Sequence, residues 1–138
     1  MKSVESPGAG KKVSETAATI LIVEDEKLLQ DSLAMILRSQ GYNVRVAGDG
    51  VEAINCLKSS VPDLILLDYF MPRLSGKEFL ENIDMADYPD TKIVVTSNIS
   101  DQQIVNDMLS LGAHKYVLKS SLSPTDLLRL VDEMLSKA

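Results

Sequence analysis

Three carboxylates stand at the ends of short apolar runs. Glu24 and Asp25 follow residues 19–23, and Asp68 ends the run 63–68, which lies between two prolines and has four apolar residues in a row. An unbroken apolar run of this length favours a strand buried on both faces, and parallel α/β sheets bind their ligands at the carboxyl ends of the strands. Because a lone charge is costly to bury, Asp68 is either a strand cap or turn residue or a functional carboxylate.

Two further polar residues follow apolar runs, Thr96 after residues 92–95 and Lys119 after residues 115–118. Parallel strands end at one edge of a sheet, so we expect all these side chains to meet there. Two like charges about 4 Å apart repel by about 1 kcal/mol in water and about 4 kcal/mol at an effective dielectric of 20. Carboxylate oxygens suit Mg²⁺, which also takes phosphate oxygens. The set therefore predicts a site for a phosphoryl group on Asp68, since aspartyl phosphate is a known covalent intermediate.

The elements that must position these residues alternate between strand and helix. Strands are expected at residues 19–23, 44–47, 63–68, 92–96 and 115–118. Amphipathic helices are expected between them and after the last, with capping boxes at 49–52, 75–78 and 100–103 and proline opening the final helix. This alternation predicts parallel strands with helices on both faces.

Length and composition indicate what kind of protein this is. The chain has 138 residues, one cysteine and a net charge of -6, which favours a single cytoplasmic domain without disulfides or direct nucleic-acid binding. No apolar run is long enough to span a bilayer. Residues 1–18 are polar and predicted to be a flexible tail, and residues 19–138 the folded domain. No output domain follows the fifth predicted helix, so we expect a stand-alone protein or an excised domain.

Four motifs carry a resemblance to a known family. Residues 22–26 read IVEDE, 66–72 LLDYFMP, 94–97 VVTS and 116–119 YVLK. In this order and at these separations they resemble the receiver domain of two-component response regulators, over residues 19–137. The resemblance implies an α/β fold: a doubly wound, five-stranded parallel sheet of order 2-1-3-4-5, in a flavodoxin-like three-layer αβα sandwich.

The resemblance also implies a phosphoacceptor and a metal site. Asp68 matches the aspartate that is phosphorylated in an Mg²⁺-dependent reaction, with Mn²⁺ as a substitute metal. Asp25 matches the carboxylate that binds the metal directly, and Glu24 the one that acts through water. The backbone carbonyl of Phe70 matches a third protein ligand. The open alternative for Glu24 is a solvated charge at a helix entry.

Switch residues and partners follow from the same resemblance. Thr96 matches the hydroxyl that moves toward the phosphoryl group, Lys119 the lysine that pairs with it, and Tyr116 the aromatic that turns inward. The alternatives are a strand cap, a surface lysine and half-buried packing, respectively. The implied partners are a histidine kinase or histidine phosphotransfer protein and an output protein bound through the fourth helix, fifth strand and fifth helix. A phosphorylation-dependent dimer is also expected.

The chain departs from the family pattern in places. Ser120 stands where the family has a proline preceded by a cis bond, which costs about 2.5–4 kcal/mol before other residues. We expect either a trans bond with a shifted loop or a strained cis bond. Phe70 and Asn98 occupy positions that flank the attacking water in the family. Because Phe70 cannot orient water by hydrogen bonding, slow self-dephosphorylation is expected.

Three other functions compete with this interpretation. A hydrolase of the haloacid dehalogenase type needs a second acidic residue two positions after its nucleophile, where this chain has Phe70. A nucleotide-binding module needs a glycine-rich loop after the first strand, where this chain has acidic residues. A receiver-like interaction module that is never phosphorylated stays open, although the complete acidic set argues against it.

Overall fold

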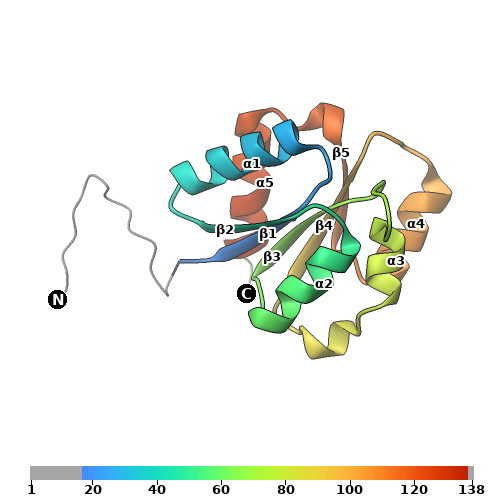
Figure 1. Cartoon of the computed structure of the whole chain (residues 1–138). Helices are drawn as coiled ribbons and strands as arrows, with labels where there is room; N and C mark the ends of the chain where they lie inside the picture. Colours follow the sequence, from blue (N-terminus) through green and yellow to red (C-terminus); the bar gives the residue numbers. More distant parts are fainter. Residues whose placement is uncertain (1–16, 137–138) are drawn as a thin grey trace.

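Five parallel strands form one sheet in the order β2-β1-β3-β4-β5 (Figure 1). The computed structural model describes residues 17–136. The strands are β1 (Thr19–Val23), β2 (Asn43–Ala47), β3 (Leu64–Asp68), β4 (Lys92–Ser97) and β5 (Lys115–Leu118). All five residues of β3 are buried, as its apolar run predicts. The predicted α/β fold and strand order are confirmed.

Helices cover both faces of this sheet. They are α1 (Lys27–Ser39), α2 (Gly50–Ser59), α3 (Gly76–Glu81), α4 (Gln102–Ser110) and α5 (Pro124–Ser136). The core is divided accordingly: one buried cluster lies between the sheet and α1 and α5, and the other between the sheet and α2, α3 and α4. Two short 3-10 helices, Met85–Asp87 and Lys119–Ser121, were not expected from the sequence.

Alternation along the strands decides which side chains share a face. The cluster beneath α1 and α5 contains, near the strand ends, Ile22, Leu66, Val94 and Val117. Residues two positions further along a strand point to the same side of the sheet. Those residues are Glu24, Asp68, Thr96 and Lys119. The sheet therefore directs one side chain from each of four strand ends toward α1 and α5.

Local capping agrees fully with the sequence at one helix, in part at a second and differs at a third. Ser75 and Glu78 form the expected reciprocal capping box of α3. At the start of α2 the Asp49 side chain accepts a hydrogen bond from the Glu52 amide as expected, but the Glu52 carboxylate accepts from the Gly48 amide instead of returning to Asp49. The expected box at residues 100–103 is wrong, because Asp101 rather than Ser100 caps α4. The Asp101 side chain accepts hydrogen bonds from the amides of Gln103 and Ile104, the second and third residues of the helix, as an N-cap side chain does.

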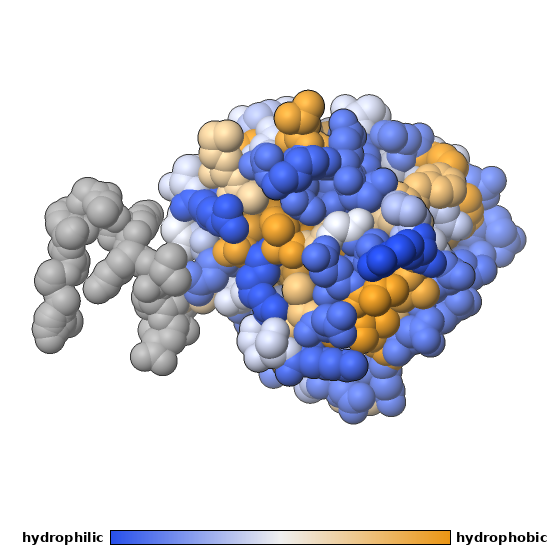
Figure 2. Space-filling view, viewed as in Figure 1, coloured by the Kyte–Doolittle hydropathy of each residue, from blue (hydrophilic) through white to orange (hydrophobic). Residues whose placement is uncertain are grey.

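Most of the predicted tail, residues 1–16, lies outside the described residues. Ala17 and Ala18 belong to the folded part, since their carbonyl oxygens accept hydrogen bonds from the side chain and the backbone of Asn43. None of the helices in residues 17–136 has the length and apolar character needed to cross a bilayer. On the face seen in Figure 2, apolar residues form separate patches among hydrophilic ones.

Candidate functional site

Three carboxylates meet at the carboxyl edge of the sheet. Glu24, Asp25 and Asp68 each offer an oxygen atom within 4.8 Å of the others. Asp68 and Glu24 are buried, with 4% and 2% of their surfaces exposed, whereas Asp25 faces solvent. The predicted grouping is therefore present in the structure, and its oxygen atoms could hold a metal ion.

Lys119 lies between the two buried carboxylates. Its Nζ is 3.0 Å from Oε1 of Glu24 and 3.2 Å from Oδ1 of Asp68, and its side chain is only 19% exposed. The other carboxylate oxygen of Glu24 accepts the Glu26 amide at 3.1 Å. The Glu24 carboxylate thus contacts both the backbone of the turn after β1 and the Lys119 ammonium group. Lys119 is not a surface lysine.

The pKa values reflect this crowding. Burial, and then the charge of Glu24, raises the pKa of Asp68 to about 7, although Lys119 acts in the opposite direction. Burial by itself would lower the pKa of Lys119, but its hydrogen bond with Glu24 and the charge of Asp68 outweigh burial, and the pKa is raised. A carboxyl group with a raised pKa beside a stable cation is typical of a functional site.

Thr96 lies directly beside Asp68 on the neighbouring strand. The two residues are register partners between β3 and β4, and the Tyr69 amide donates to the Thr96 carbonyl oxygen at 2.9 Å. Thr96, Glu24 and Lys119 form the polar wall of a small cavity of about 50 Å³. Its apolar wall comes from α1 and the segment before α5, through Leu29, Leu33 and Leu122. Thr96 therefore lies on the side of the sheet that α1 and α5 cover, next to the carboxylate group.

Phe70 begins the loop that leads from β3 to α3. Its amide donates to Oδ1 of Asp68 at 3.3 Å, so its backbone is close to the carboxylate. The side chain is 55% exposed and packs edge to face against Tyr69, with ring centroids 4.8 Å apart. Gly76 closes the loop: its amide donates to the Tyr69 carbonyl oxygen at 3.0 Å, and an added Cβ would lie 2.6 Å from the Asp68 carbonyl oxygen.

Tyr116 and Asn98 lie outside the carboxylate group. Tyr116 packs against the cluster on the α2, α3 and α4 face, opposite to Asp68, and its hydroxyl donates to the Ile99 carbonyl oxygen at 2.7 Å. Asn98 is exposed in the segment after β4. Tyr116 thereby joins β5 to the segment that connects the Thr96 strand with α4.

The bond after Lys119 is trans, as are all peptide bonds in residues 17–136. Lys119–Ser121 forms a 3-10 turn, closed by the Leu122 amide donating to the Lys119 carbonyl oxygen at 3.1 Å. Of the two expected states of this bond, the trans one is therefore present, and the loop that follows it is a 3-10 turn. The turn brings the lysine to the carboxylates without the family's proline.

Sequence reasoning missed Gln30 of α1. This buried side chain donates from Nε2 to the carbonyl oxygen of Glu24 at 2.9 Å and to that of Ala47 at 3.4 Å. It ties the ends of β1 and β2 together and so fixes the backbone that carries Glu24. A glutamine on the inner face of an otherwise apolar helix stripe was the available signal.

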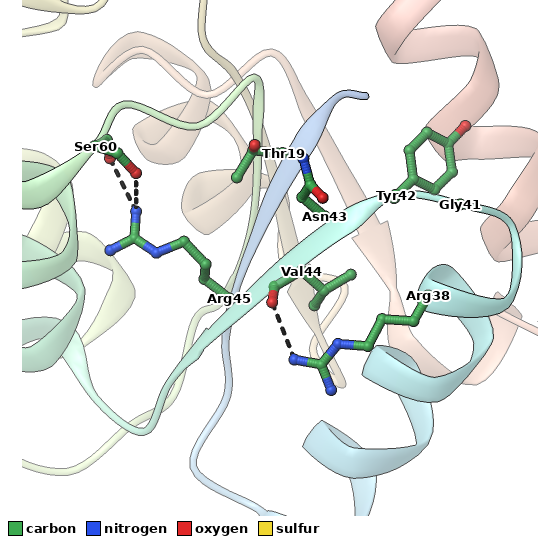
Figure 3. A pocket seen from close by; sticks show the side chains of 8 residues that line it. All are labelled: Thr19, Arg38, Gly41, Tyr42, Asn43, Val44, Arg45 and Ser60. Carbon is green, nitrogen blue, oxygen red and sulfur yellow. Dashed lines mark hydrogen bonds between the residues drawn. The ribbon is translucent and has the colours of Figure 1, made fainter. Parts of the chain in front are cut away.

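A second hollow lies at the amino end of β1 and β2, away from the carboxylates (Figure 3). Its volume is about 480 Å³. Arg38 donates to the Val44 carbonyl oxygen, and Arg45 donates to the Ser60 carbonyl oxygen and side chain. Figure 3 shows the two guanidinium groups directed to different sides of β2, so they do not converge on one ligand.

A comparison with models of protein families agrees with this fold. Residues 20–132 match the model of the response regulator receiver domain. The chain belongs to this family. Receiver domains of this family are parts of two-component signalling systems, which is the class predicted from the sequence.

Individual relatives of the receiver domain include the chemotaxis protein CheY of Treponema pallidum, 33% identical over 114 residues that cover 80% of this chain and 78% of the relative. The transcriptional regulatory protein PdtaR of Mycobacterium tuberculosis is 35% identical over 119 residues, covering 86% of this chain and 57% of the relative. The sensory transduction protein RegX3 of Mycolicibacterium smegmatis is 35% identical, but the match covers only 43% of its length. The chain thus spans about half the length of some curated relatives.

Solved structures lead to the same fold. A CheY-like receiver domain from Methanospirillum hungatei superimposes with a TM-score of 0.80 at 29% identity, covering 86% of this chain and 94% of that one. The chemotaxis protein CheY4 of Vibrio cholerae gives a TM-score of 0.80 at 27% identity, covering 86% and 99%. The receiver domain here therefore has the CheY-like arrangement of strands and helices.

Proposed function

We propose that this receiver domain is a phosphorylation-dependent signalling switch, in which Asp68 accepts a phosphoryl group from a phosphohistidine. The observation that carries the proposal is the position of the Lys119 ammonium group, 3.2 Å from Asp68 and 3.0 Å from Glu24, in a group of buried carboxylates. Such a group is costly for the fold. Its presence at the ligand-binding edge of the sheet is explained by phosphoryl transfer.

The carboxylates fit Mg²⁺, for which Mn²⁺ can substitute. Three carboxylate oxygens within 4.8 Å of one another provide the hard ligands that this cation prefers. Asp25, Asp68 and the Phe70 backbone carbonyl would bind it directly, and Glu24 through water. When bound, the cation would supply positive charge that offsets both the carboxylates and the oxygens of the transferred group.

The chain's own residues would perform the transfer. An ionised oxygen of Asp68 forms the new O–P bond while the P–N bond of the donor phosphohistidine breaks, and the electron pair returns to the imidazole nitrogen. Lys119 favours the ionised form of Asp68 and balances the charge that develops on the phosphoryl oxygens. The donor would be a histidine kinase or a histidine phosphotransfer protein.

The output would be a shift between two packings of α4, β5 and α5. A phosphoryl group on Asp68 adds negative charge next to Thr96, the register partner of Asp68. Movement of the Thr96 hydroxyl toward that charge changes the segment to which Tyr116 is hydrogen-bonded. The exposed surface of α4, β5 and α5 would then favour an output partner or a second copy of the domain.

We infer that the protein catalyses only its own phosphorylation and dephosphorylation and turns over no other substrate. Its expected location is the cytoplasm. The competing proposal is a receiver-like interaction module that binds a partner through the same surface but is never phosphorylated. The two proposals differ in one measurable property, the gain of a phosphoryl group.

The test is incubation of the full chain with Mg²⁺ and acetyl phosphate, followed by intact mass spectrometry. Gain of the mass of one phosphoryl group, lost in Asp68→Asn and in the absence of divalent cations, supports the proposal. Asp31→Asn, a change of the same kind in an exposed ion pair of α1, is the matched control and should be phosphorylated like the wild type. No mass gain in the wild type, or a gain that persists in Asp68→Asn, contradicts it.

A further inference from the structure

The loop between β3 and α3 contains a strained turn centred on Arg73. The Leu74 amide donates to the Pro72 carbonyl oxygen at 2.8 Å, which closes a three-residue turn, and Arg73 has a φ of +68°. It is the one non-glycine residue with positive φ among residues 17–136. A γ-turn with positive φ is rare and strained for residues other than glycine. A non-glycine residue at such a position is expected to make a contact that offsets the backbone strain.

The Arg73 side chain makes an ion pair with the helix next to the loop. Its guanidinium nitrogen lies 2.7 Å from Oδ2 of Asp49, a carboxylate that is only 15% exposed. The other oxygen of Asp49 accepts the Glu52 amide at 2.8 Å and so caps α2. The Glu52 amide first, and Arg73 after it, hold the pKa of Asp49 below its ordinary value against the effect of burial. One carboxylate thus joins α2 and the turn.

The backbone strengthens the same junction. The Gly50 amide donates to the Leu74 carbonyl oxygen at 3.2 Å, and an added Cβ at Gly50 would lie 2.7 Å from that oxygen. The turn therefore packs tightly on the first residue of α2, which lies beside α3 in Figure 1. The Asp49–Arg73 ion pair spans this contact on its solvent side, since the Arg73 side chain is 63% exposed.

The turn is also connected to the phosphoacceptor. Only Phe70 and Met71 separate it from Tyr69, and the Phe70 amide donates to Oδ1 of Asp68. At its far end the loop returns to β3 through the Gly76 amide and the Tyr69 carbonyl oxygen, 3.0 Å apart. A loop held at both ends and in the middle transmits a displacement of the turn to the Phe70 backbone.

We propose that the Asp49–Arg73 ion pair positions the backbone of residues 70–72 against the carboxylates, so that Asp49 and Arg73 are positioning residues for divalent-cation binding. The inference rests on the proposed function, in which the Phe70 carbonyl is a ligand. Neither residue touches the cation. Their effect is to keep the loop in the one conformation that presents this carbonyl.

The experiment is calorimetric titration of the full chain with MgCl₂. Arg73→Gln and Asp49→Asn, which keeps a capping oxygen on α2, should each weaken Mg²⁺ binding by about threefold to tenfold, the range expected for a coupled contact. The double variant should bind no more weakly than either single one, and Arg73→Lys should retain most of the affinity. Arg73→Gly removes the strained φ together with the ion pair and should weaken binding like Arg73→Gln.

The matched control is Arg129→Gln, which removes an equal charge from an ion pair with Asp126 within α5 and should leave Mg²⁺ binding unchanged. Wild-type affinity in Arg73→Gln, additive losses in the double variant, or binding by Arg73→Gly as tight as in the wild type would each overturn the inference while leaving the proposed function intact. A wild-type protein that binds no Mg²⁺ would overturn both.

Discussion

The ammonium nitrogen of Lys119 lies 3.2 Å from Oδ1 of Asp68, in a site where both side chains are largely buried. Removing this cation leaves Asp68 and Glu24 as buried like charges. We expect Lys119→Gln to lower the free energy of unfolding at pH 8, without divalent cations, by about 1–3 kcal/mol, because an uncompensated buried charge is costly and protonation of one carboxylate limits the loss.

Urea unfolding would measure this loss. Lys115→Gln is the control, because Lys115 is half-exposed and its Nζ lies 3.9 Å from Glu133, and an exposed pair of this kind contributes little. Equal stabilities of the two variants would contradict the prediction. Mg²⁺ should restore part of the stability of Lys119→Gln, since it supplies the missing positive charge.

Stability should depend on pH through Asp68. Burial and Glu24 raise its pKa from 3.8 to about 7 in the folded protein. The folded state therefore binds the proton more tightly than the unfolded state, so this group contributes most stability below pH 4 and loses that contribution as pH rises through 7. Asp68→Asn removes the group, and its stability relative to the wild type should increase between pH 5 and pH 8.

This comparison requires urea unfolding of both proteins at several pH values in the presence of a chelator. Taking the difference between them cancels the other titrating groups, including His114, whose pKa is lowered by burial and by Lys92. Parallel pH profiles would show that Asp68 does not carry the dependence. Mg²⁺ should reduce the advantage of Asp68→Asn at pH 8, because the wild type binds the cation more tightly.

Gly76→Ala should destabilise the fold. The new Cβ would lie 2.6 Å from the carbonyl oxygen of Asp68 and 3.0 Å from Cα of Tyr69, and both are backbone atoms that cannot move aside independently. Overpacking of this kind costs about 1–3 kcal/mol. Gly48→Ala is the control, because its Cβ would meet only a Glu52 carboxylate oxygen at 3.4 Å. Thermal unfolding of both variants tests the difference, and similar losses would contradict it.

Phe70→Asn should shorten the lifetime of the phosphorylated protein. The Phe70 ring is 55% exposed beside Asp68 and offers no hydrogen bond to an attacking water. An amide that gains about 1 kcal/mol from such a bond would speed hydrolysis roughly fivefold. The measurement is the decay of phosphoprotein after removal of the donor, with Phe70→Leu as an apolar control. An unchanged decay in Phe70→Asn would count against the role of this position.

Much of the fold follows from local sequence. The apolar run of β3 predicts burial on both faces, and Ser75 with Glu78 predicts the start of α3, because capping and strand burial depend on neighbouring residues. Side chains alternate in direction along each strand, so Asp68 points to the same side of the sheet as Leu66, and Thr96 to the same side as Val94. The error at Ser100 shows the limit of local rules, since Ser100 and Asp101 are adjacent residues that can both cap a helix and the side chain of Asp101 is the one that does.

Local sequence could not determine the contacts between residues that are far apart in the chain. Lys119 with Glu24, Arg73 with Asp49, and Tyr116 with the Ile99 carbonyl oxygen are all such pairs. Each depends on where several packed elements bring two side chains, and the competing contacts differ little in energy. The residue types and strand ends thus predicted by themselves that the carboxylates and Lys119 meet at one edge of the sheet. Only tertiary packing decided that the ammonium group lies between Glu24 and Asp68 and that the Arg73 turn contacts Asp49.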